Sequence, residues 1–378
     1  MFSQRFINLA AAIASIVVFG FALGLMFPLL SLLMERAGVS AKMIGYNTAM
    51  APLGILLAGF IVPRLVRRFG AKIVVITAAW IAATIVLSYY FTAIPWWFAL
   101  RILHGLAVST LFSISEAWIV RFASGNYRTR ILAIYTSMLA LSFGGGPALI
   151  AYVGIDGILP FAIGAGVLIA ATIPMYLVRE PPSLEDPKAA LSALAFAPKA
   201  PILLLAVGLF AIIDAANLGF LPVYGVKKGM DRETAALILT AFIVGNTIFQ
   251  LPIGWLADHY PKRKVMAGCA IVTALTSALI PLSFGTILLW PVLLVCGAAS
   301  AGIYTVALSE LGERFSGNEL VAGTASFATV WGLGAIFGAL LGGWAFQSFG
   351  PDGLPLSIAA VFALFIGAVI WRQRMRRS

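Results

Sequence analysis

Residues 9–34 form one apolar segment that contains no Asp, Glu, Lys or Arg. The hydrocarbon core of a bilayer is roughly 30 Å thick, and a helix of about 20 apolar residues crosses it. Eleven further apolar segments follow, and 61% of the chain is hydrophobic whereas only 10% is charged. A soluble surface cannot be built from so few polar groups. The sequence therefore predicts an all-α integral membrane protein with twelve transmembrane helices.

The expected spans fall into two groups of six. The first group is 9–34, 44–63, 73–92, 95–120, 131–153 and 158–177, and the second is 202–225, 234–257, 265–285, 287–309, 321–346 and 354–371. The segment between the groups contains five prolines and several charges, which is typical of a solvated linker. We expect an N-terminal six-helix bundle over 1–178, a cytoplasmic linker over 179–201 and a C-terminal six-helix bundle over 202–378.

The basic residues predict the orientation of the chain. If the N-terminus is cytoplasmic, the tails and loops on that side hold 19 of the 25 Lys and Arg residues, the opposite loops hold five, and the last one is Arg101. Such a bias is typical of cytoplasmic loops. The net charge of +11 therefore indicates membrane-flanking loops rather than binding of nucleic acid. We expect a multi-pass protein of the inner (cytoplasmic) membrane with both termini in the cytoplasm.

The two halves resemble each other in sequence. AGFIVPRLVRRFGAK at 58–72 aligns with IGWLADHYPKRKVMA at 253–267, and the hairpin DGILP at 156–160 corresponds to DGLP at 352–355. Glu116 and Glu310 also fall at equivalent places, each preceded by a serine. Two six-helix repeats of the same orientation predict a functional site where the repeats meet.

With these features the chain resembles the major facilitator superfamily of transporters, and within it the YcaD-like group. The resemblance covers the whole chain and is carried by RILHGLAVSTLFSISEAW, LAIYTSMLALSFGGGPAL, QLPIGWLADHYPKRK and LGERFSGNELVAGTASFATVWGLGAIFGALLGG. It implies transport of a small-molecule substrate by alternating access, and a protein that works as a monomer.

The resemblance also implies a conformational latch after span 8. The family's loop motif is matched by Gly254 and Asp258, and the family pattern suggests Arg314 as the partner of Asp258. Gly254 would allow two helices to approach closely. In the first half Pro63 occupies the Asp position, so we expect a weaker latch there. The alternative is that these charges only mark loop topology.

Span 4 carries Arg101, His104 and Glu116 within an apolar segment. A charged residue at mid-helix costs at least about 2.5–3.5 kcal/mol, so each of these side chains needs water or a partner on another helix. By resemblance, Arg101 and Gly105 match the family's span-4 motif. We expect Arg101 and His104 to bind substrate or take part in proton coupling, and the alternative is structural interhelical bonding. For Glu116 and for Glu310 in span 10, pairing with loop Arg residues is the equal alternative.

Asp214 in span 7 is the remaining acid at membrane depth, and Asn217 follows it on the same face. Asn246 and Gln250 in span 8 are spaced one helical turn apart. By resemblance, spans 4, 7 and 10 line the central cavity. We expect these four residues to contribute to the substrate and proton-coupling site, or else to bond neighbouring helices to each other.

Gly146 and Pro147 in GGGPAL partly match the span-5 motif of proton-coupled exporters, although Ser142 replaces an upstream glycine. The two cysteines and two histidines have no metal-ligand spacing, and no nucleotide-binding loop or nucleophile–base pair occurs. We therefore expect no enzyme, no cofactor and no metal site.

The leading hypothesis is a secondary transporter that exports a small organic compound in exchange for protons. The alternatives are an importer or uniporter of a small anion, and a membrane sensor or assembly protein that does not transport.

Overall fold

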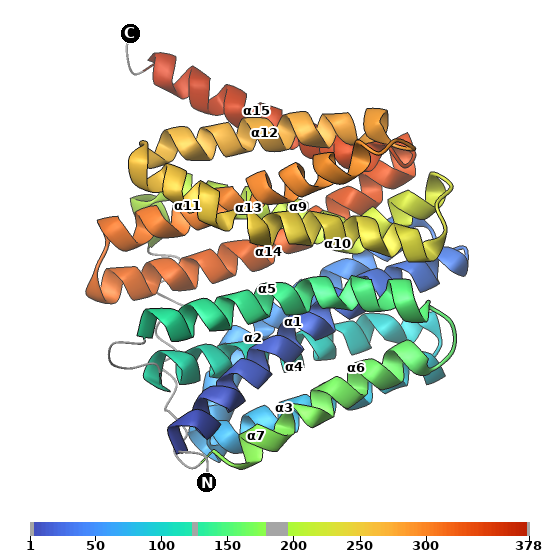
Figure 1. Cartoon of the computed structure of the whole chain (residues 1–378), viewed down its shortest axis with the longest axis vertical. Helices are drawn as coiled ribbons and strands as arrows, with labels where there is room; N and C mark the ends of the chain where they lie inside the picture. Colours follow the sequence, from blue (N-terminus) through green and yellow to red (C-terminus); the bar gives the residue numbers. More distant parts are fainter. Residues whose placement is uncertain (1–3, 123–127, 179–195, 376–378) are drawn as a thin grey trace. The chain divides into compact units, whose positions relative to one another are not determined.

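The computed structural model describes residues 4–122, 128–178 and 196–375, and nearly all of them are helical (Figure 1). Within these residues eleven helices are long and apolar enough to span a membrane, and a twelfth segment contains the shorter apolar stretch Gly353–Gly367. The prediction of an all-α membrane protein is thereby confirmed. Most of the linker expected at 179–201 lies outside the described residues.

The chain divides into two compact units, one of residues 1–38 and 47–191 and the other of residues 39–46 and 192–378. The helices of the first part of the chain are α1 (Gln4–Arg36), α2 (Ala41–Phe69), α3 (Ala71–Phe91), α4 (Ile94–Phe122), α5 (Arg128–Val153), α6 (Leu159–Ala170) and α7 (Thr172–Tyr176). Those of the second part are η2 (Ala197–Lys199), α9 (Pro201–Lys227), α10 (Arg232–Ile248), α11 (Gln250–His259), α12 (Lys262–Ser283), α13 (Leu289–Arg314), α14 (Gly317–Phe349) and α15 (Gly353–Met375).

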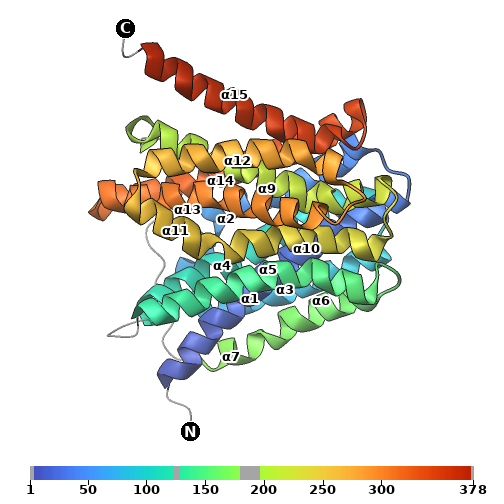
Figure 2. The same ribbon diagram turned by 45° about the horizontal axis from the view of Figure 1, so that its top comes forward.

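Each unit is organised around its first helix. In one unit α1 packs against α4, α5, α6 and α7, and in the other α9 packs against α10, α13, α14 and α15. The most apolar stretches of α1 and α9 are 83% and 72% buried, the two highest values among the spans. Figure 2 shows α12 running between α13 and α15. The first and seventh spans are therefore the central helices of their bundles.

Two of the expected spans are interrupted rather than continuous. The sixth span changes from α6 to α7 at Ala171, and the eighth changes from α10 to α11 at Phe249. In both cases a proline, Pro174 or Pro252, lies three residues after the interruption. Because proline has no N–H to donate to the preceding turn, it weakens the helix at that point. By contrast, α5 continues through Pro147.

Glycines bring the same pair of helices close together in both units. A methyl group at Gly105 would collide with the carbonyl of Ala51, so α2 and α4 touch through their backbones. Gly297 meets the carbonyl of Phe242 in the same way, where α13 crosses α10. Gly146 makes a third such contact, with Gly24 and Leu25 of α1. Backbone approach through small residues is the usual means of packing membrane helices.

Candidate functional site

Arg101 lies in α4 with only 1% of its surface exposed. Its Nη1 donates a hydrogen bond to Asn47 Oδ1 over 2.7 Å, and its Cζ lies 4.8 Å from the centre of the Phe27 ring. His104 is also 1% exposed and stands edge-on to the ring of Tyr89, with 6.3 Å between the ring centres. Side chains of α1, α2, α3 and α4 thus form one buried polar cluster, which we call the Arg101 cluster.

Several polar atoms of the Arg101 cluster are buried and have no hydrogen-bond partner in the part of the chain that the structure describes. They are Arg101 Nη2, Asn47 Nδ2, His104 Nε2 and Tyr89 Oη. No carboxylate lies within ion-pair distance of Arg101 among those residues either. Buried polar groups are normally satisfied by protein, water or a bound molecule. The cluster therefore retains both positive charge and hydrogen-bonding capacity.

Arg101 and His104 were expected from the sequence, whereas Asn47, Tyr89 and Phe27 were not. Asn47 had a detectable signal, because the pair Asn47-Thr48 interrupts the apolar second span. Tyr89 and Phe27 had none, since aromatic residues are common in membrane helices for other reasons.

Glu116 lies farther along α4, fifteen residues from Arg101, and its side chain is exposed. It forms no ion pair within the described residues. The adjacent Ser115 Oγ is 2.8 Å from Tyr135 Oη of α5, which joins these two helices. The structure therefore places Glu116 apart from the Arg101 cluster.

Asp214 lies in the middle of α9 and is partly buried, and no hydrogen-bond or ion-pair partner is found for it within the described ranges. Ile212 faces α14, because its carbonyl meets Gly338 there. At about 100° per residue, Asp214 and Asn217 lie on the other side of α9. Phe210 shares that side and contacts Tyr304 of α13, with 5.3 Å between ring centres. Asp214 therefore faces toward α13.

Asn246 and Gln250 flank the interruption between α10 and α11. Gln250 Nε2 donates to the carbonyl oxygen of Asn246 over 2.6 Å, and lies 3.3 Å from Asn246 Oδ1. Thr305 Oγ1 of α13 donates to Gln250 Oε1. Thr305 follows Tyr304 directly on α13, the helix that Asp214 faces. We call Asn246, Gln250 and Thr305 the polar trio, and it therefore includes a residue of that helix. Thr305 was not among the residues expected from the sequence.

Glu310 is 7% exposed and is held by two cations. Its Oε1 accepts a hydrogen bond from Arg314 Nη1 over 3.0 Å and lies 3.6 Å from Arg263 Nε. Lys262 forms an ion pair with Glu313 one turn away. Together these pairs connect the start of α12 to the end of α13, which is the structural pairing that was one of the alternatives for Glu310.

The expected partners of the latch are not together in this structure. Asp258 is exposed and lies outside ion-pair distance of Arg314, which is bound to Glu310 instead. Gly254 makes no close helix contact, since a methyl group there would meet nothing within 4 Å. Among the described residues there is also no group of three His, Cys, Asp or Glu side chains that could hold a metal ion.

Apolar helices of spanning length that carry Arg, His and Asp side chains at membrane depth are characteristic of membrane transporters. The chain belongs to the Major Facilitator Superfamily, whose family description matches residues 12–231 and 203–378. It is accordingly a secondary transporter and not an enzyme.

Curated relatives and solved structures agree with this assignment. The chain is 26% identical over 339 residues to the uncharacterized MFS-type transporter YfkF of Bacillus subtilis (strain 168), covering 87% of this chain and 86% of the relative. It is 20% identical to the uncharacterized MFS-type transporter YcaD of Shigella flexneri serotype 5b (strain 8401), covering 83% and 81%. The nucleoside transporter NupG superposes with a TM-score of 0.81 at 13% identity, covering 98% of both chains. A D-xylose-proton symporter superposes with a TM-score of 0.75 at 16% identity, covering 96% and 97%. At these identities the two structures are evidence of the fold alone.

Proposed function

We propose that this protein exports a small organic compound across the inner membrane in exchange for protons, by alternating access between two six-helix bundles joined by the linker at 179–201. The observation that carries the proposal is Asp214, a carboxyl group at the middle of a central helix without an ion-pair partner in the described parts of the chain. An unpaired acid at membrane depth is costly and is retained where it binds protons or substrate. We therefore assign Asp214 as the group that binds and releases the coupled proton during transport.

The polar trio of Asn246, Gln250 and Thr305 is assigned to substrate binding. It lies where the helix is interrupted, and interrupted membrane helices expose backbone acceptors that bind ligands in other transporters. Asn217, one turn from Asp214, extends the same polar surface. A neutral or weakly polar organic compound fits amide and hydroxyl groups of this kind.

The Arg101 cluster is assigned a second role in the cycle. The guanidinium remains charged at all relevant pH values, so it acts as a fixed cation rather than a proton carrier. In this proposal it interacts with a negatively charged group that appears during transport, such as a deprotonated carboxylate or the substrate. Glu116 is not that carboxylate, because fifteen residues of continuous helix, about 22 Å, separate it from Arg101.

Export and orientation rest on sequence patterns. Gly146 and Pro147 partly match the motif of proton-coupled exporters, and the bias of Lys and Arg favours cytoplasmic termini. Asp258 and Arg314 are proposed to pair in another state of the cycle, after Arg314 has left Glu310.

The second candidate function is import or facilitated diffusion of a small anion. It is favoured by one observation, namely that Arg101 is buried with a free Nη2 and no carboxylate partner in the described residues. A small anion would neutralise this charge, and His104 Nε2 could donate to it when protonated.

The experiment that tests these proposals uses the purified protein in liposomes that contain a pH-sensitive dye. A chemically diverse panel is first screened for ligands that raise the unfolding temperature, and each such compound is then tested for transport and proton movement. We expect substrate-dependent proton flux that Asp214→Asn abolishes. The control is Glu233→Gln, an exposed carboxyl group in the first turn of α10, which leaves flux unchanged.

Three outcomes separate the candidates. Transport that is independent of any pH gradient and is lost in Arg101→Ala supports the anion importer or uniporter. A ligand effect that is unchanged in both Asp214→Asn and Arg101→Ala makes these charges structural and overturns the proposed mechanism. If no compound moves across the bilayer and a partner protein co-purifies, the sensor or assembly protein gains support.

A further inference from the structure

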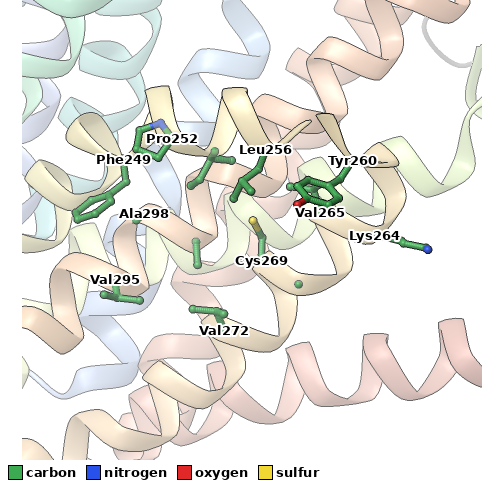
Figure 3. Close-up of a pocket in the computed structure, with 13 residues that line it drawn as sticks. Phe249, Pro252, Leu256, Tyr260, Lys264, Val265, Cys269, Val272, Val295 and Ala298 are labelled. Carbon is green, nitrogen blue, oxygen red and sulfur yellow. The ribbon is translucent and has the colours of Figure 1, made fainter. Parts of the chain in front are cut away.

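A long apolar groove lies on the outer surface of α11, α12 and α13, with a volume of about 510 Å³ (Figure 3). Phe249, Leu256, Val272 and Val295 contribute to its walls, and its polar lining groups are Tyr260, Lys264 and the Cys269 thiol. The residues beside the groove are exposed and apolar. Leu251 is 84% exposed and Leu275 is 59% exposed. In a membrane-spanning bundle such surfaces contact lipid, so the groove opens to the bilayer.

The groove has a polar end and an apolar end. Tyr260 and Lys264 lie where α11 ends at His259 and α12 begins at Lys262. Val272, at the apolar end, is eight residues farther along α12, a rise of about 12 Å. Figure 3 shows Tyr260 and Lys264 at one end of the groove, with Val272 and Val295 away from them. The groove therefore runs from the end of two spans into the membrane interior.

The positive charge at this end is only partly neutralised. Of three successive cations, Lys262 pairs with Glu313, and Arg263 lies 3.6 Å from Glu310. Lys264 is exposed, and no hydrogen-bond or ion-pair partner for its Nζ is found in the described parts of the chain. Asp258, the acid that precedes it on α11, is not within ion-pair distance. One unneutralised cation thus stands at the mouth of an apolar groove.

We propose that the groove binds an anionic glycerophospholipid, with one acyl chain between α11 and α12 and the phosphate at Lys264 Nζ and Tyr260 Oη. The apolar walls suit a hydrocarbon chain, and a hydroxyl and an ammonium group at the membrane boundary suit a phosphate. A zwitterionic lipid fits the apolar part equally well, but its cationic headgroup gains less from Lys264. The site belongs to the lipid-facing surface and is independent of the substrate site proposed above.

The test places the full chain in phosphatidylcholine nanodiscs that contain a small fraction of a lipid with a photoactivatable acyl chain. The probe is either phosphatidylglycerol or phosphatidylcholine, and labelled residues are mapped by mass spectrometry. We expect phosphatidylglycerol to label the groove residues about fivefold more than phosphatidylcholine, the effect of one interfacial cation. Equal labelling by the two lipids in the wild-type protein overturns the proposal without reference to any variant.

Three variants sharpen the test. Lys264→Gln should remove the preference for phosphatidylglycerol, whereas Lys42→Gln, which removes an exposed cation elsewhere, should retain it. Gly268→Leu should reduce labelling by both lipids, because Gly268 lines the groove and a Cβ added there meets nothing within 4 Å, so the new side chain fills groove space. Persistent preference in Lys264→Gln, or labelling by either lipid that maps away from the groove residues, also contradicts the proposal.

Discussion

Asp352 accepts two hydrogen bonds, one from Tyr224 Oη of α9 over 3.0 Å and one from Lys228 Nζ, directly after α9, over 3.1 Å. This contact ties the end of the seventh span to the turn that precedes the twelfth. The first half of the chain repeats it, since Arg36 at the end of α1 pairs with Asp156 before α6. The internal repeat seen in the DGILP and DGLP hairpins therefore extends to the ion pair that each hairpin makes.

Asp352→Asn should lower the free energy of unfolding by about 1 kcal/mol, since it weakens a partly buried ion pair and a charge-assisted hydrogen bond. Asp156→Asn is the matched control and should cost less, because the Asp156 side chain is 77% exposed whereas that of Asp352 is 40% exposed. Thermal unfolding in detergent measures both variants. A larger loss for Asp156→Asn would show that exposure does not determine the strength of these pairs.

Gly105→Ala should destabilise the first unit by about 1–3 kcal/mol, because the added methyl group forces α4 away from the Ala51 carbonyl. Gly254→Ala makes the same chemical change where a methyl group meets nothing, so its unfolding temperature should equal or slightly exceed that of the wild type. Comparison of the two unfolding temperatures checks the prediction, and equal destabilisation would show that the contact with the Ala51 carbonyl is not the cause.

Asn47→Ala should cost about 1–3 kcal/mol, because it removes the side-chain acceptor of the buried Arg101 guanidinium. Asn47→Asp places a carboxylate at the same position and should raise stability above that of Asn47→Ala. If Arg101 must remain available during transport, this aspartate will also slow transport by neutralising it. Unfolding and liposome uptake are measured in parallel, and an Asn47→Asp protein with full activity would remove Arg101 from the proposed cycle.

Thr305→Val should weaken ligand-induced stabilisation at least severalfold, because Gln250 loses the hydroxyl group that orients it. Thr240→Val serves as the control, since within the described residues the Thr240 Oγ1 hydrogen-bonds to the Ala236 carbonyl of its own helix, at 3.5 Å, and to no other helix. The intrinsic unfolding temperature should change little in either variant. If Thr305→Val and Thr240→Val bind the ligand with the same affinity, the substrate does not bind at Gln250 and Thr305.

Asp231 caps the N-terminus of α10, and the hydrogen bond from the Thr234 backbone N–H holds the pKa of Asp231 below its usual range. A depressed pKa in the folded state means that this contribution to stability is present above the unfolded pKa of about 3.9 and is lost as pH falls through the folded value. Asp231→Ala should cost about 1 kcal/mol at neutral pH. The difference from wild type should shrink in acid, which unfolding curves at neutral and acidic pH will measure.

The sequence was sufficient to predict the helical class because hydropathy and helix length alone determine which segments can cross a bilayer. It was not sufficient for the interruption at Phe249, since Pro28 and Pro222 lie in helices that continue without a break. The effect of a membrane proline depends on what its neighbours offer to the freed backbone groups.

The site shows the same limit. Arg101 stood out because any charge in an apolar span requires an explanation. Its partner Asn47 lies 54 residues away, and the close contacts of α2 with α4 at Gly105 and Gly54 bring the two helices together. Arg314 was expected to bind Asp258. In this structure it binds Glu310 instead, which lies one turn away on the same helix. Proximity in space, rather than residue type, decided each of these partners.

The interruption at Phe249 also affects how recognition by this protein can be studied. Pro252 offers no N–H to the Ile248 carbonyl, so an acceptor of the main chain remains at the interruption of the eighth span. No side-chain replacement at Ile248 removes that oxygen. An alanine scan of the span would therefore pass over a hydrogen-bonding group that belongs to the peptide itself. Pro252→Ala is the replacement that would satisfy this oxygen. It restores an N–H at position 252 that can donate to the Ile248 carbonyl and so join the two turns of helix.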